Sequence, residues 1–285
     1  MRDPAAVRVS AEPRVEVLDD PEATSRAAAS AVAEALAAAV RERGRADWVT
    51  TGGSTPVGIY RELAVAPLRD AVPWHAVNVW WGDDRFVPRD HPLSNVLALD
   101  QVLVSAAARA GLSGTGEYAV DVDLGTEPGV GLPSSNIHAP RMSEAIASGA
   151  GLDWVATEYA DRIRDAGLPT AEGFPIFDVV LVGIGPDGHV LSVFPGSPLF
   201  DSEAWASAVP APTHVEPHVA RVSLQPRILE LARLPILVAH GAGKAAILAT
   251  VLGGERDVRR WPAQLARRDG AVWFVDKAAA AALPG

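Results

Sequence analysis

An apolar run in this sequence ends abruptly in glycines and titratable side chains: Phe177-Asp-Val-Val-Leu-Val-Gly-Ile-Gly-Pro-Asp-Gly-His189. The uninterrupted run from Val179 to Val182 predicts a strand that is buried on both faces, as in a parallel sheet covered by helices. The turn that follows places Asp187 and His189 at the carboxyl end of that strand. Open α/β folds bind their ligands at this edge of the sheet, so we expect a functional site there.

The same segment also satisfies the dinucleotide pattern G-x-G-x-x-G through Gly183, Gly185 and Gly188. That fingerprint needs a helix that opens at the third glycine, because the helix N-terminus holds the pyrophosphate. Pro195 and Pro198 leave room for little more than one helical turn. The interpretation of this chain as a nucleotide-binding dehydrogenase therefore rests on this match alone. A titration that shows no binding of NAD would exclude it.

The bulk composition is that of a globular protein: 285 residues, 48% apolar and 21% charged, with a net charge of -10. We expect one α/β domain over residues 1–285. No basic stripe offsets the negative charge, so we expect no nucleic-acid partner. The chain has no cysteine and begins without an apolar leader, and we therefore expect a cytoplasmic protein. The alanine-rich run 27–39 is too short to cross a membrane.

Strand and helix patterns alternate along the chain. They predict strands at 15–18, 48–51, 77–81, 179–182, 236–239 and 272–275. They predict helices at about 21–43, 56–64, 95–104 and 152–166, a further helix that begins at Pro226, and another that opens at Gly241–Lys244 and ends at about Leu252. This alternation predicts a single open, mostly parallel sheet flanked by helices, a Rossmann-like α/β fold. Segments 205–209 and 218–224 predict a small antiparallel addition. Residues 111–135 are rich in glycine and proline and predict a surface excursion.

Two helix starts carry groups that suit an anion. The turn of Gly52, Gly53, Ser54 and Thr55 offers free N–H groups and hydroxyls for an oxyanion or a phosphate, although it also fits a simple capped strand-to-helix turn. Lys244 lies in the first helical turn after Gly241-Ala-Gly, where a cation opposes the helix dipole. That placement favours an anion beside Lys244, and the alternative is a solvated lysine.

Two further loops carry candidate catalytic groups. In Asp83-Asp84-Arg85, one acid can pair with Arg85 while the other faces a cleft, or the whole turn can be solvated. His189 has Asp187 two residues earlier, and a carboxylate that fixes the imidazole tautomer would make His189 a general base; the alternative is a capped loop histidine.

Metal and serine-hydrolase motifs are absent. Neither H-E-x-x-H nor G-x-S-x-G occurs, and Pro217 prevents His214 and His218 from sharing a helix face. We interpret this pair as part of a polar loop, and we expect no metal.

Several short motifs follow one another in a specific order along nearly the whole chain. They are Thr51-Gly-Gly-Ser-Thr-Pro56, Trp81-Gly-Asp-Asp-Arg-Phe-Val-Pro88 with His91 and Ser94-Asn95, Gly183-Ile-Gly-Pro-Asp-Gly-His189 with Phe194-Pro195-Gly196, Arg221-Val-Ser223, Gly241-Ala-Gly-Lys244, Trp261-Pro-Ala and Val272-Trp-Phe-Val-Asp276. In this order the sequence closely resembles the 6-phosphogluconolactonase family. That family shares its fold with the glucosamine-6-phosphate deaminases and isomerases.

The resemblance implies hydrolysis of 6-phosphoglucono-δ-lactone in the oxidative pentose phosphate pathway, without a cofactor, by a monomer or small homo-oligomer. His189, oriented by Asp187, would activate water, and Asp83 would position the water or a sugar hydroxyl. The phosphate would lie on the Gly52–Thr55 turn, with Lys244 and either Arg85 or Arg221. Donors for the developing oxyanion would be N–H groups near Gly185–His189 or a cationic side chain.

Three positions separate this chain from its relatives. The deaminases carry a glutamate five residues after the histidine, where this chain has Phe194, which argues against deamination. Val190 and Asp84 replace the threonine and glutamate that are usual in the lactonases. A sugar-phosphate isomerase or deaminase is the alternative enzyme. A phosphosugar sensor without activity is a third reading, although we expect no DNA-binding helix-turn-helix before Val15.

Overall fold

The computed structural model describes residues 12–104 and 129–283, and a seven-stranded sheet forms their centre. All neighbouring strands of this sheet are parallel. In sheet order the strands are β1 (Arg14–Leu18), β12 (Val272–Asp276), β11 (Leu234–Ala239), β8 (Val179–Val182), β2 (Ala46–Thr50), β3 (Val77–Trp81) and β5 (Ile137–His138). The predicted open parallel sheet is thus confirmed.

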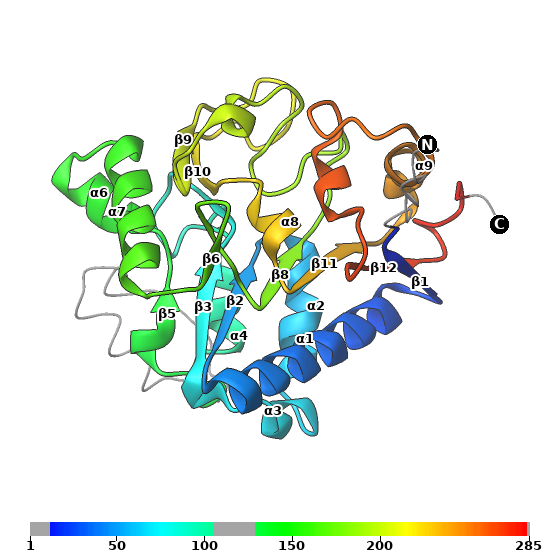
Figure 1. Ribbon diagram of the computed structural model, residues 1–285, viewed down its shortest axis with the longest axis horizontal. Helices are drawn as coiled ribbons and strands as arrows, with labels where there is room; N and C mark the ends of the chain where they lie inside the picture. The colour runs from blue at the N-terminus through cyan, green and yellow to red at the C-terminus, as the bar shows by residue number, and fades with distance from the viewer. Residues whose placement is uncertain (1–11, 105–128, 284–285) are drawn as a thin grey trace, which may run out of the picture.

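Alternate side chains of β2, β3, β8, β11 and β12 enter two separate cores, because successive residues of a strand point to opposite faces of the sheet. Trp48 and Trp81 join the core beneath α1 (Pro21–Arg43), α2 (Ser54–Leu63), α3 (Leu68–Ala71) and α4 (Leu97–Val102). Val49 and Trp80 join the core beneath α6 (Met142–Ser148), α7 (Leu152–Asp165), α8 (Ile228–Leu231), α9 (Ala245–Gly253) and the 3₁₀ helix η5 (Pro262–Ala266). Figure 1 shows the long α1 running beside the strands, with α6 and α7 at one end and α9 at the other.

The first long helix follows its sequence signals closely. Asp20 accepts a hydrogen bond from the Ala23 N–H at 2.7 Å, Pro21 occupies the first turn, and Gly44 ends the helix. The predicted helix 95–104 is shorter than expected and begins only at Leu97. The reason is that the Ser94 hydroxyl and the Asn95 N–H both donate to the side chain of Asp84, which holds these two residues outside the helix.

A small antiparallel sheet packs above the carboxyl edge of the main sheet (Figure 1). Its strand order is β4 (Asp83–Arg85), β10 (Arg221–Leu224) and β9 (Ala206–Val209), which confirms the antiparallel addition. The register pairs Arg221 with Arg85 and Ser223 with Asp83. The remaining elements are β6 (Thr170–Ala171), β7 (Phe174–Pro175), η1 (Trp74–Ala76), η2 (Ser134–Asn136), η3 (Pro198–Asp201) and η4 (Ala242–Lys244).

The strand order reverses between β8 and β2. The chain continues from β2 to β3 on one side and from β8 to β11 on the other. Loops that leave such neighbouring strands diverge, and they open a crevice at the carboxyl edge of the sheet. The glycine-rich turns after β2 and β8 therefore flank this crevice.

Most of the predicted excursion, residues 111–128, lies outside the described residues. At its end Val130 forms a parallel bridge with Val104, and both Val130 and Leu132 are buried. None of the described helices combines the length and apolar character needed to cross a membrane.

Candidate active site

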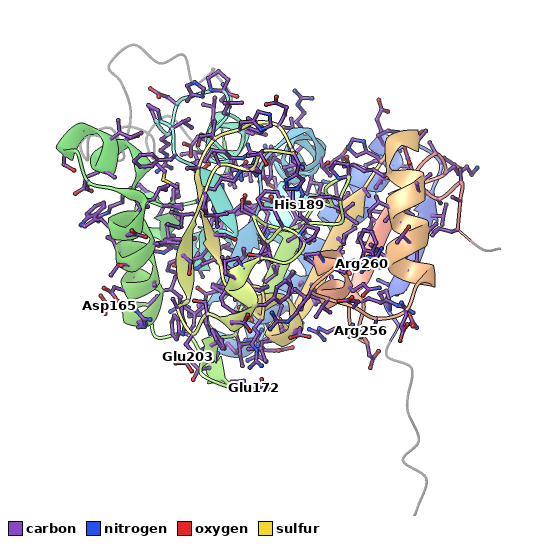
Figure 2. All side chains as sticks on the ribbon, turned by 90° about the horizontal axis from the view of Figure 1, so that it is seen from above. Asp165, Glu172, His189, Glu203, Arg256 and Arg260 are labelled. Atoms are coloured by element: carbon purple, nitrogen blue, oxygen red, sulfur yellow. The ribbon has the colours of Figure 1, made fainter. Side chains whose placement is uncertain are left out.

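A pocket of about 260 Å³ lies in the crevice at the carboxyl edge. It brings together loops that follow β2, β3, β8 and β11, and Figure 2, which looks onto this edge, shows His189 near the middle of the molecule. The predicted site residues that line it are Gly52, Gly53, Thr55, Asp83, Arg85, His189, Arg221 and Lys244. Asp187 lies behind His189, and the prediction for the Ser54 hydroxyl falls outside what the structure describes.

His189 is held by Asp187 through one ring nitrogen. The distance from His189 Nδ1 to Asp187 Oδ1 is 2.6 Å, and the His189 N–H lies 3.2 Å from the same oxygen. Burial on its own raises the pKa of Asp187, but the hydrogen bonds and charge of His189 and a hydrogen bond from His214 hold that pKa well below its usual range. Asp187 is therefore ionised and accepts a hydrogen bond from Nδ1–H of His189. The proton stays on Nδ1, which leaves the lone pair of Nε2 available to accept another proton.

The backbone at Gly185 lies directly against the His189 ring. A Cβ at this position would stand 2.1 Å from both Nδ1 and Cε1 of the ring, so only glycine leaves room for the imidazole in this orientation.

Gly185→Ala is expected to lower kcat by about tenfold to a hundredfold, because the added Cβ would displace the imidazole that we expect to act as the general base. Steady-state kinetics, with circular dichroism to confirm the fold, measure this effect. Gly131→Ala is the matched control, since a Cβ at that position meets no atom within 4 Å. Equal rates for the two variants would contradict the tight packing of the ring.

The turn uses most of its own N–H groups. The Gly185 N–H donates to the His189 carbonyl at 2.9 Å, the Gly188 N–H donates to the Gly185 carbonyl at 3.1 Å, and the His189 N–H binds Asp187. These three N–H groups are therefore not directed at a ligand in the pocket. Of the two sources of oxyanion donors predicted from the sequence, the geometry favours a cationic side chain.

Asp83 lines the pocket, yet both of its carboxylate oxygens have protein partners. Asn95 Nδ2 lies 3.1 Å from Oδ1, and Ser192 Oγ lies 2.5 Å from Oδ2. Asn95 in turn packs so tightly on Gly52 that a Cβ there would stand 2.1 Å from its Oδ1. Asp83 thus ties the turn after β2 to the segment after His189.

Asp84 points away from the pocket and organises the backbone behind it. Its Oδ1 accepts from the N–H groups of Asn95, at 2.7 Å, and Arg85, at 2.8 Å. Burial raises the pKa of Asp84 to about 7, although these two N–H groups counteract the rise. Of the two alternatives that the sequence left open for this turn, the pairing of one acid with the Arg85 guanidinium is not formed. Arg85 Nη1 donates to the Leu93 carbonyl at 2.8 Å instead.

Three cationic side chains line the pocket. Arg221 is 2% exposed, and its guanidinium donates to the carbonyls of Pro217 and Val219. Arg85 is partly exposed, and its buried Nε has no partner. Lys244 Nζ donates to the Ile184 carbonyl at 2.6 Å, and burial lowers the pKa of Lys244 while the nearby Asp187 raises it. The pocket can therefore hold an anionic ligand.

Comparison with known proteins identifies the family. The family model described as glucosamine-6-phosphate isomerases/6-phosphogluconolactonase matches residues 19–274. The chain belongs to this family. A 6-phosphogluconolactonase of Streptomyces coelicolor is 31% identical over 277 residues, covering 97% of each chain. That of Mycobacterium tuberculosis is 30% identical over 270 residues, covering 95% of this chain and 98% of the relative. The solved 6-phosphogluconolactonase of Trypanosoma cruzi superposes with a TM-score of 0.77 at 25% identity, covering 98% of this chain and 100% of that one.

One position bears on the two activities named in the description of the glucosamine-6-phosphate isomerase/6-phosphogluconolactonase family. The ring centroids of Phe194 and His189 lie 4.7 Å apart, and the guanidinium of Arg221 lies over the Phe194 ring, 5.3 Å from its centroid. Among the described residues Asp187 is the only carboxylate that hydrogen-bonds His189. In the described part of the chain, Phe194 therefore takes the place of the second carboxylate that deamination would require beside the histidine.

The sequence did not single out three residues that complete the site in this member of the family. Asn95 and Ser192 bind Asp83, and His214 binds the second oxygen of Asp187 at 3.0 Å. Ser94-Asn95 had been noted only as part of a motif, and His214 as part of a polar loop. No group of three or more histidine, cysteine, aspartate or glutamate side chains that could hold a metal occurs in the described parts of the chain.

Proposed function

We propose that this chain hydrolyses 6-phospho-D-glucono-1,5-lactone to 6-phosphogluconate, with His189 as the general base. The observation that carries the proposal is the imidazole whose Nδ1 binds Asp187, set in a pocket with three cationic side chains. The 31% identity to a 6-phosphogluconolactonase over 97% of both chains supports it. We infer that this hydrolysis is a step of the oxidative pentose phosphate pathway and takes place in the cytoplasm.

The reaction follows from the tautomer of His189. A water oxygen attacks the lactone carbonyl carbon while Nε2 takes the water's proton, and Asp187 stabilises the resulting imidazolium. The tetrahedral intermediate then breaks its bond to the ring oxygen, and the imidazolium returns the proton to that leaving oxygen. The product is an open-chain carboxylic acid with His189 restored to its neutral form.

The phosphate end of the substrate would lie on the first turn of α2. Gly52, Gly53 and Thr55 line the pocket there, and a helix N-terminus favours an anion. Arg85 is better placed than Arg221 to reach the phosphate, because the Arg221 guanidinium is buried and engaged by two carbonyls. The cationic groups that do not bind the phosphate remain for the oxyanion. Since Asp83 is held by Asn95 and Ser192, we assign it a positioning role.

Lys244→Met is expected to raise KM for the phosphorylated lactone by about tenfold to a hundredfold, because a charge-assisted hydrogen bond to phosphate contributes about 1.5–3 kcal/mol. The expected change in kcat is smaller. Lys277, the other lysine of the chain, pairs with Asp19 on the surface and gives the control Lys277→Met. An unchanged KM in Lys244→Met would remove this lysine from the phosphate site.

Two substrates distinguish the proposal from its alternative. The purified protein is expected to accelerate acid release from 6-phosphogluconolactone and to release no ammonia from glucosamine-6-phosphate. Ammonia release without lactone hydrolysis would establish the deaminase instead, and binding of both sugars without turnover would favour a sensor.

A further inference from the structure

The carboxylate of Asp187 is shared by two histidines. His189 Nδ1 lies 2.6 Å from Oδ1, and His214 Nε2 lies 3.0 Å from Oδ2. The first imidazole lines the pocket, whereas the side chain of the second is 53% exposed. The mechanism above uses only the first of these hydrogen bonds.

An aromatic ring holds the two imidazoles at fixed places around the carboxylate. Phe194 is 8% exposed, and its ring centroid lies 4.7 Å from that of His189 and 5.5 Å from that of His214. The guanidinium of Arg221 packs over the same ring at 5.3 Å. His214 is therefore seated against a buried side chain of the site and does not merely touch Asp187 from solvent.

The segment that carries His214 also forms part of the pocket wall. Val215 and Glu216 follow it directly, and both line the pocket. The hydrogen bond from His214 to Asp187 therefore fastens this wall to the turn that bears the general base.

We propose that His214 is a positioning residue that sets how strongly Asp187 supports a proton on His189. A hydrogen bond to a carboxylate stabilises its charged form and reduces its attraction for a further proton. With His214 bound to Oδ2, Asp187 stabilises the imidazolium of His189 less than it would alone. Removing the hydrogen bond from His214 is therefore expected to strengthen the support that Asp187 gives to a proton on His189. The catalytic consequence rests on the proposed function.

Other charged groups surround this pair and remain unchanged when His214 is replaced. They are Asp83 and Arg85 on β4, Arg221 on β10, Lys244 on η4, Arg260 in the groove beyond Asp187, and Glu216 with His218 on the loop of His214 itself. Figure 2 shows Arg260 on the α9 side of His189. Because their field is common to the wild type and the His214 variants, a difference between these proteins reports the His214 contact.

The chain offers a matched control on the same loop. The side chain of His218 is 49% exposed and binds the Pro212 carbonyl at 2.7 Å and Glu216 at 3.1 Å, and it forms no hydrogen bond or ion pair with Asp187. Removing His218 disturbs the loop without touching the carboxylate. Removing His214 disturbs both.

The direct test is an NMR titration of the His189 ring in the full-length protein. His214→Ala is expected to move its midpoint to higher pH by about half a unit relative to wild type. His214→Gln, whose Nε2 can donate at the same place, should return the midpoint toward the wild-type value, and His218→Ala should leave it unmoved. His214→Ser, measured in parallel, repeats the comparison in case the alanine variant folds poorly. A midpoint that is equal in wild type, His214→Ala and His214→Ser overturns the proposal.

Kinetics then separate this inference from the proposed function. In His214→Ala the acid limb of kcat/KM for the lactone is expected to move upward with the NMR midpoint, and KM should rise as the wall loosens. A shifted midpoint in a protein without lactonase activity would contradict the proposed function and leave the positioning role intact. Lactonase activity with an unmoved midpoint and acid limb would contradict the positioning role alone.

Discussion

Replacing His189 by glutamine is expected to lower kcat for the hydrolysis of 6-phosphogluconolactone by about a thousandfold, within the range contributed by a positioned general base. Glutamine preserves polarity and approximate size but cannot accept a proton from water. The ring is in contact with Asp187 and Phe194 and lines the pocket, so the loss should appear in kcat with little change in KM. Stopped-assay kinetics at saturating lactone measure it.

A matched control for this variant lies at the other end of the sheet. His75 belongs to η1, which precedes the amino end of β3, and its side chain is remote from the pocket. His75→Gln is expected to retain wild-type kcat. A His189→Gln variant with more than about a tenth of wild-type kcat would show that another group activates the water.

Asp187→Asn is expected to lower kcat by at least about a hundredfold, as the loss of an aspartate behind a catalytic histidine does elsewhere. The amide NH₂ can donate to Nδ1, which moves the ring proton to Nε2 and removes the proton acceptor from the pocket. The lost negative charge also destabilises the imidazolium, so any residual activity should show its acid limb at lower pH. This direction is opposite to that expected for His214→Ala.

Asp201→Asn controls for the change of charge. Asp201 is exposed, forms an ion pair with Arg259 and does not line the pocket, so its replacement should leave kcat and the pH profile unchanged. If Asp187→Asn kept the wild-type pH profile, the carboxylate would serve only to hold the turn.

The sheet and the loops at its edge could be predicted because their signals are local. The apolar segments Val179–Val182 and Val77–Trp81 correspond to β8 and β3 with the same bounds. Turn chemistry placed Asp187 and His189 directly after β8, and parallel strands bring such turns to one edge. The pocket residues that directly follow strand ends could therefore be predicted from the sequence.

The contacts that complete the site could not be predicted because they join distant segments. His214 binds Asp187 across 27 residues, and Ser192 binds Asp83 across 109. The sequence also left open whether an acid pairs with the Arg85 guanidinium, and in the structure that guanidinium donates to the Leu93 carbonyl instead. Such choices depend on loop paths, which hydrophobic periodicity does not encode.

The most direct test follows the decay of freshly generated 6-phosphogluconolactone at a mildly acidic pH, with buffer alone, wild-type protein and His189→Gln in parallel. Our account predicts that wild type accelerates formation of 6-phosphogluconate well above the spontaneous rate and that the folded His189→Gln variant stays close to the buffer control. Wild-type protein that decays the lactone no faster than buffer, or a variant as fast as wild type, would contradict the assignment of His189 as the base of a phosphosugar lactonase.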